Sequence, residues 1–155
     1  MLKEGDAAPD VTLQLPDGSL KPLSAFARPL VLYFYPKDDT PGCTNEAKDF
    51  SSLKGTFDAA GVGLLGVSKD PPGKHAKFTA KYDLAVPLAT DADGNVTEGF
   101  GTWIEKSLYG RKYMGIERAT FLIGAENRIA RIWHNVKVKG HAEEVLAAAQ
   151  ALEGA

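Results

Sequence analysis

The segment from Pro29 to Pro36 constrains the fold more than any other part of this 155-residue chain. It reads Pro-Leu-Val-Leu-Tyr-Phe-Tyr-Pro, so it is almost continuously apolar, β-branched or aromatic between two prolines. A run of this kind is typical of a strand that is covered on both faces. We therefore expect a central strand here, with other elements packed against both of its sides.

The hydrophobic period changes in the segment that follows. Between residues 40 and 60, apolar side chains recur at spacings of three and four, which places them on one stripe of a helix. Gly61 then supplies a helix end. The residues of the stripe are Ala47, Phe50, Leu53, Phe57 and Ala60.

The rest of the chain continues this alternation of strands and helices. A hairpin is expected first (11–15 and 19–23), and after the long helix a strand (62–67), a helix (72–82), a short strand (87–90), a short helix (95–101), a hairpin (119–123 and 128–133) and a last helix (141–152). The pattern predicts an α/β fold in one domain, residues 1–155, with a central mixed sheet, helices on both faces and antiparallel edges from the last hairpin. The stretch Thr102–Arg118 is expected to be the longest irregular loop, whose aromatic residues either pack or line a site entrance.

Charge and composition exclude several function classes. The net charge is −2 and charged residues make up 25% of the chain, without a basic arm, so no nucleic-acid partner is expected. The first residues lack the apolar core of a secretory signal, and no apolar run reaches the length of a membrane span, which favours a cytoplasmic protein without a membrane partner. One cysteine and three scattered histidines give no disulfide framework, and we expect no metal and no cofactor.

The segment Tyr35–Glu46 carries the chemistry. It joins the buried strand to the long helix, and ligands of open α/β sheets bind at such carboxyl ends of strands. Thr40 suits the N-cap and Pro41 the first helical position, so that Cys43 lies in the first turn. There, free N–H groups and the helix dipole favour the thiolate, which is the nucleophilic form. A buried structural cysteine is the alternative, although Thr-Pro-Gly and the charged residues before Cys43 argue against it.

These residues resemble a known family. Pro36-x-x-x-Thr40-x-x-Cys43 matches the peroxiredoxin active-site motif, and residues 34–47 resemble the peroxiredoxin Q subfamily, also called bacterioferritin comigratory protein. Residues 112–123 and 136–145 are similar to the same subfamily, so the resemblance runs nearly end to end. It implies a thioredoxin-like fold with an N-terminal hairpin and a thiol-dependent peroxidase acting on hydrogen peroxide and organic hydroperoxides.

The resemblance also implies roles for five residues. Cys43 would attack the peroxide and become a sulfenic acid, and Thr40 would hydrogen-bond and align the peroxide. Arg118 would stabilise the thiolate and the charge that develops on the leaving oxygen. Pro36 would shield the sulfur from water, and Glu46 would orient Arg118.

The chain departs from many members of the subfamily in having no resolving cysteine. The two positions where relatives carry one are Lys48 and Thr79 here. We therefore expect a one-cysteine variant that needs an external thiol, such as thioredoxin, glutaredoxin with glutathione, or a small thiol. A monomer is expected, with a dimer as the alternative.

Two other functions remain open. A redox sensor would signal through oxidation of Cys43 without efficient turnover. A thiol–disulfide oxidoreductase is less well supported, because the position three residues after Cys43 is Glu46 rather than a second cysteine.

Overall fold

A seven-stranded mixed sheet forms the centre of the computed structural model, which describes residues 1–153. The strand order is β2-β1-β5-β4-β3-β8-β9. The strands are β1 (Thr12–Gln14), β2 (Leu20–Pro22), β3 (Leu30–Phe34), β4 (Gly63–Ser68), β5 (Leu88–Thr90), β8 (Ala119–Ile123) and β9 (Ile129–Trp133).

β3 is the central strand that the sequence predicts. All five of its residues are buried. It pairs in parallel with β4 and antiparallel with β8, and β4 pairs in parallel with β5. The predicted mixed α/β fold is therefore confirmed. Of the last hairpin only β9 lies at an edge, because β8 pairs with β3 on its other side; the opposite edge comes from the N-terminal hairpin.

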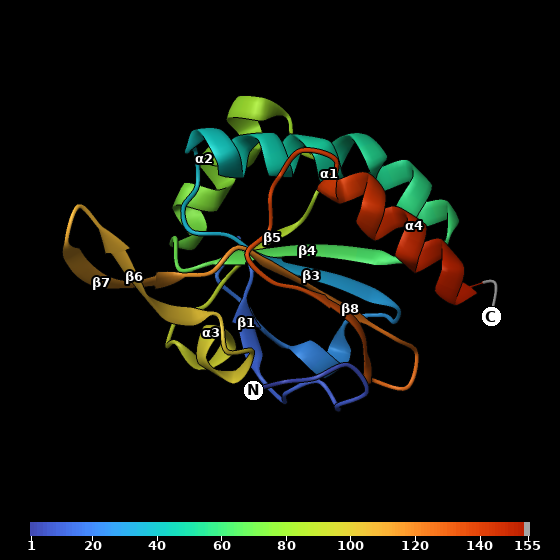
Figure 1. Cartoon of the computed structure of the whole chain (residues 1–155). Coiled ribbons are helices and arrows are strands. Elements are labelled where there is room, and N and C mark those ends of the chain that lie inside the picture. The colour runs from blue at the N-terminus through green and yellow to red at the C-terminus, as the bar shows by residue number, and fades with distance from the viewer. Residues whose placement is uncertain (154–155) are drawn as a thin grey trace.

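Helices cover the two faces of the sheet unequally. α1 (Pro41–Ala59), α2 (Pro72–Tyr82) and α4 (His141–Glu153) lie over one face, as Figure 1 shows. The other face is covered by the short α3 (Asn95–Gly99), by the N-terminal segment and by the one-turn 3-10 helix Leu23–Ala25. Each face thus has its own hydrophobic cluster, with β3 contributing alternate residues to both.

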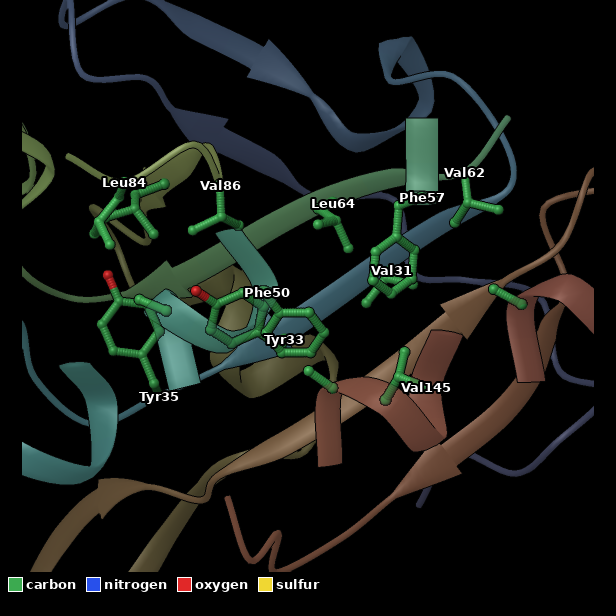
Figure 2. Close-up of a cluster of buried hydrophobic side chains, with 14 of the residues drawn as sticks. Val31, Tyr33, Tyr35, Phe50, Phe57, Val62, Leu64, Leu84, Val86 and Val145 are labelled. Carbon is green, nitrogen blue, oxygen red and sulfur yellow. The ribbon is translucent and has the colours of Figure 1, made fainter. Parts of the chain in front are cut away.

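Aromatic rings fill the core under α1. Tyr33 of β3 stacks on Phe50 of α1 with ring centroids 4.7 Å apart, and Phe50 contacts Phe57 about two turns further along (Figure 2). The stripe predicted for this helix therefore faces the sheet. On β4, Gly66 lies under the Tyr33 ring, where a Cβ atom would come within 2.6 Å of Tyr33 Cζ.

The stretch expected to be an irregular loop is a second, two-stranded sheet. β6 (Trp103–Leu108) and β7 (Arg111–Ile116) pair antiparallel in register from end to end. The hairpin projects from the body of the molecule beside the N-terminal end of α1 (Figure 1). Its turn residues, Tyr109 and Gly110, both have positive φ, as a two-residue type I′ turn requires. The prediction of a loop at 102–118 is therefore wrong.

None of the helices in the described part of the chain is both long and apolar enough to span a membrane.

Candidate active site

Cys43 lies where the central strand ends and α1 begins. The helix starts at Pro41, with Thr40 at the N-cap in extended conformation. The side chain of Thr40 does not cap the helix; its hydroxyl donates to the carbonyl oxygen of Lys37 at 2.9 Å. Cys43 is in the first helical turn and is only 2% exposed.

Arg118 joins the sulfur to a buried carboxylate. Its Nη2 donates to Cys43 Sγ at 3.3 Å, and its Nη1 donates to Glu46 Oε1 at 2.6 Å. Arg118 comes from the connection between β7 and β8, so the fold closes a gap of 75 residues to make this contact. The structure thus brings Cys43 and Glu46 to the same guanidinium.

Gly42 leaves room for the guanidinium. A Cβ atom at this position would lie 3.2 Å from Arg118 Nη2, the atom that donates to the sulfur. The absence of a side chain at residue 42 is therefore part of the geometry of the site.

The charges at the site influence one another strongly. Burial raises the pKa of Glu46 to about 7, although Arg118 opposes this shift. Burial by itself would lower the pKa of Arg118, but Glu46 and Cys43 raise it above its usual value. Arg118 therefore stays cationic beside the sulfur, and Glu46 is the group here that titrates near neutral pH. The second carboxylate oxygen of Glu46 is buried without a hydrogen-bond partner.

Pro36 lies at the mouth of a groove next to the site. The groove has a volume of about 370 Å³ and runs between Pro36 and the β6–β7 hairpin, which contributes Trp103, Lys106 and Tyr113. Burial and the nearby Arg118 lower the pKa of Lys106, so this wall of the groove faces the guanidinium that contacts Cys43. Pro36 itself is exposed, whereas Tyr109 at the hairpin tip points into solvent away from the groove.

Two buried polar residues at the loop between β3 and α1 belong to no recognisable sequence motif. Asp38 and His75 are 2% and 0% exposed, and their side chains are 2.7 Å apart. His75 shares a helical stripe with Phe78 and Tyr82, and this spacing is the one signal in the sequence that indicates its burial. Nothing local to Asp38 predicts that it points inward.

Comparison with known proteins places the chain in a family. The model of the AhpC/TSA family matches residues 4–132. Peroxiredoxin Bcp of Xanthomonas campestris is 47% identical over 92% of this chain and 89% of its own, and peroxiredoxin Bcp of Bacillus subtilis is 44% identical over 92% and 91%. The chain belongs to the AhpC/TSA family, in its Bcp or peroxiredoxin Q group. It is therefore a peroxiredoxin, an enzyme of the peroxidase class, as the sequence predicts.

Solved structures of the same group confirm the thioredoxin-like fold that the resemblance implies. A structure of Xanthomonas campestris peroxiredoxin Q has a TM-score of 0.88 at 45% identity, covering 99% of this chain and 98% of that one. Two other structures of that protein carry cysteine-to-serine changes at different positions, so that relative has at least two cysteines. This peroxiredoxin has one.

Proposed function

We propose that this peroxiredoxin reduces hydrogen peroxide and organic hydroperoxides at Cys43 through a sulfenic acid that an external thiol reduces. The observation that supports the proposal most directly is the pair of hydrogen bonds that Arg118 donates. Two nitrogens of its guanidinium donate to the sulfur of Cys43 and to Glu46. A rigid bidentate donor of this kind holds a cation at the position where negative charge forms and moves during the reaction.

In the first step the Cys43 thiolate attacks the terminal oxygen of the peroxide. The S–O bond forms as the O–O bond breaks, and the oxygen of the leaving group departs as hydroxide or alkoxide and takes up a proton. Arg118 stabilises the charge on the sulfur before the attack and on the leaving oxygen afterwards. The products are a sulfenic acid on Cys43 and water or an alcohol.

Thr40 would fix the direction of attack. Because its hydroxyl hydrogen is donated to Lys37, the lone pairs of its oxygen remain free to accept a hydrogen bond from the peroxide. Pro36 would limit the access of water from the groove side. Glu46 would keep Arg118 in place.

The cycle would end with two thiol groups from outside the chain, supplied by two small thiols or by one dithiol reductant. The first condenses with the sulfenic acid to a mixed disulfide and releases water, and the second attacks that disulfide and returns Cys43 to the thiol. The residues at positions 48 and 79 are lysine and threonine, so neither can do this internally. Thioredoxin, glutaredoxin with glutathione, or a small thiol are the reductants we propose, acting on a monomer.

Steady-state peroxide consumption tests this function. Glutathione, dithiothreitol and a thioredoxin system are compared side by side with the unmodified protein and Cys43→Ser. We expect many turnovers with at least one reductant and none with Cys43→Ser. Activity that survives in Cys43→Ser would contradict the proposal.

The alternative is a redox sensor that uses the same cysteine. The buried position of Cys43 beside an arginine serves oxidation in either role. The same experiment separates the two: one oxidation per protein molecule with every reductant would favour the sensor, and repeated turnover favours the enzyme.

A further inference from the structure

One residue of the loop between β3 and α1, Asp38, is held in the interior of the protein. Pro36, Lys37 and Asp39 of this loop are exposed, whereas Asp38 points inward and is buried. Asp38 lies two residues after Pro36 and two before Thr40, so the contacts that hold Asp38 also restrict the positions of these two residues.

Both oxygens of the Asp38 side chain are engaged. Oδ1 accepts from the hydroxyl of Tyr35 at 2.5 Å, and Oδ2 lies 2.7 Å from Nδ1 of His75. His75 comes from α2, and its ring is completely buried. An aspartate and a histidine from different elements thus meet in the interior, away from solvent.

The hydrogen-bond partners of His75 determine where its protons are. Its Nε2 lies 3.0 Å from the carbonyl oxygen of Ala89, which can only accept, so Nε2 must carry a hydrogen. Its Nδ1 faces a carboxylate oxygen of Asp38, so a second hydrogen lies between them. The hydroxyl of Tyr35 also donates to Asp38, so one buried carboxyl group joins the loop to both Tyr35 and His75.

A second aspartate, Asp70, attaches the loop to the sheet. The backbone N–H of Asp38 donates to Asp70 Oδ2 at 2.7 Å, and Asp70 also accepts from Ser68 at the end of β4. The hydroxyl of Thr90, at the end of β5, donates to the carbonyl oxygen of Asp70 at 2.6 Å. The loop is thereby tied to the carboxyl ends of two parallel strands as well as to α2.

We propose that the buried, hydrogen-bonded pair Asp38–His75 positions the loop for the reaction with peroxide, holding Thr40 and Pro36 at the sulfur. The proposal rests on the peroxidase function given above. Neither residue touches the sulfur or the peroxide, so both are positioning residues rather than catalytic ones.

A purely structural role makes a different prediction. Well-packed apolar side chains often replace a buried pair of polar or charged groups at no cost in stability. Fold stability alone therefore does not require an aspartate and a histidine here. If the pair serves catalysis, replacing both partners by apolar residues should leave the fold intact and still impair the reaction with peroxide.

The test compares three proteins: the double variant Asp38→Leu/His75→Phe, the isosteric variant Asp38→Asn, and the matched control Asp58→Asn. Asp58 is also paired with a basic residue, Lys54, but on the exposed face of α1. For each we measure the rate of Cys43 oxidation by hydrogen peroxide, the rate of Cys43 alkylation by iodoacetamide, and urea unfolding. Alkylation reports whether the thiolate is intact, because it does not use Thr40.

We expect the double variant and Asp38→Asn to fold and to react with peroxide about tenfold to a hundredfold more slowly, with alkylation within twofold of the unmodified protein. Peroxide oxidation at the unmodified rate in both would overturn the proposal, and so would an equal loss of both reactions. If the double variant does not fold, Asp38→Asn decides alone. Unmodified protein that peroxide does not oxidise would instead overturn the peroxidase function, before any variant is compared.

A spectroscopic measurement tests the contact independently of activity. In protein with 15N-labelled histidine, we expect the 15N shifts of the His75 ring to change in Asp38→Asn and to stay the same in Asp58→Asn. His75 shifts that are identical in Asp38→Asn and the unmodified protein would overturn the contact.

Discussion

The hydrogen atom that serves as the side chain of Gly42 decides where the guanidinium of Arg118 can lie. In Gly42→Ala the new methyl group would lie 3.2 Å from Arg118 Nη2, closer than ordinary contact. Since Nη1 is held by Glu46, we expect Nη2 to be displaced from the sulfur and oxidation of Cys43 to slow about tenfold. Stopped-flow mixing with peroxide measures this rate. Gly73→Ala is the control because no atom lies within 4 Å of its Cβ position; equal rates in the two variants would contradict the prediction.

A second prediction at the residue scale concerns the two hydrogen bonds that the guanidinium of Arg118 donates. Lysine has a single ammonium and cannot donate to Cys43 and Glu46 in the fixed geometry of a guanidinium. In Arg118→Lys we therefore expect the rate of oxidation by peroxide to fall about tenfold to a hundredfold, although the charge is kept. Arg131→Lys, an exposed arginine on β9, is the control. An unchanged rate in Arg118→Lys would show that charge alone is sufficient.

At the scale of elements, hydrophobic periodicity predicts the helices and strands that bury one face, and it does not predict strands that are exposed on both faces. The bounds of α2 follow from its prolines and apolar spacing, and those of α1 from Pro41 and the stripe that ends near Gly61. β6 and β7 are mostly exposed on both sides, so neither strand shows an alternating pattern. Their turn also lacks the usual Asn-Gly, because Tyr109 takes the first position.

The same reasoning explains which site residues the sequence reveals. Cys43 and Thr40 are local to one strand–helix junction, where capping preferences predict the geometry. Arg118 is 75 residues away, and periodicity gives no reason to bring it to the sulfur; only the resemblance does. Asp38 and His75 meet through tertiary packing between a loop and α2, which no local pattern encodes.

The packing of β3 against β4 yields a prediction about stability. In Gly66→Ala a Cβ atom would come within 2.6–2.9 Å of the ring and hydroxyl of Tyr33, which is held by Phe50 from the other side. We expect the free energy of unfolding to fall by about 1–3 kcal/mol, as for other overpacked cores. Urea unfolding measures the change. Gly55→Ala on the exposed face of α1 should instead raise it by about 0.5–1 kcal/mol. An unchanged free energy of unfolding in Gly66→Ala would mean that Tyr33 moves to make room for the methyl group, contrary to its tight packing.

For the whole molecule, the stability depends on pH through Glu46. Its pKa in the folded protein is about 7, raised from 4.5 by burial, so the folded state binds this proton more tightly than the unfolded state. The stabilisation is complete below about pH 4.5 and is lost as the pH rises through 7, a change on the order of 3 kcal/mol. We expect urea unfolding to show that Glu46→Gln gains stability relative to the unmodified protein across this range. A difference that stays constant with pH would contradict the assignment.

The single cysteine determines how the whole molecule responds to excess peroxide. With lysine at position 48 and threonine at 79, the proposed sulfenic acid would depend on a thiol from another molecule, and a second peroxide molecule would compete by oxidising it to the sulfinic acid. We therefore expect peroxide in excess to inactivate the protein within one turnover when no thiol is present, with sulfinic acid on Cys43 in the mass spectrum. The same dose with glutathione or dithiothreitol should leave most of the activity. Full activity after peroxide alone would mean that the sulfenic acid is protected by the fold, and that the buried position of Cys43 outweighs the missing second thiol.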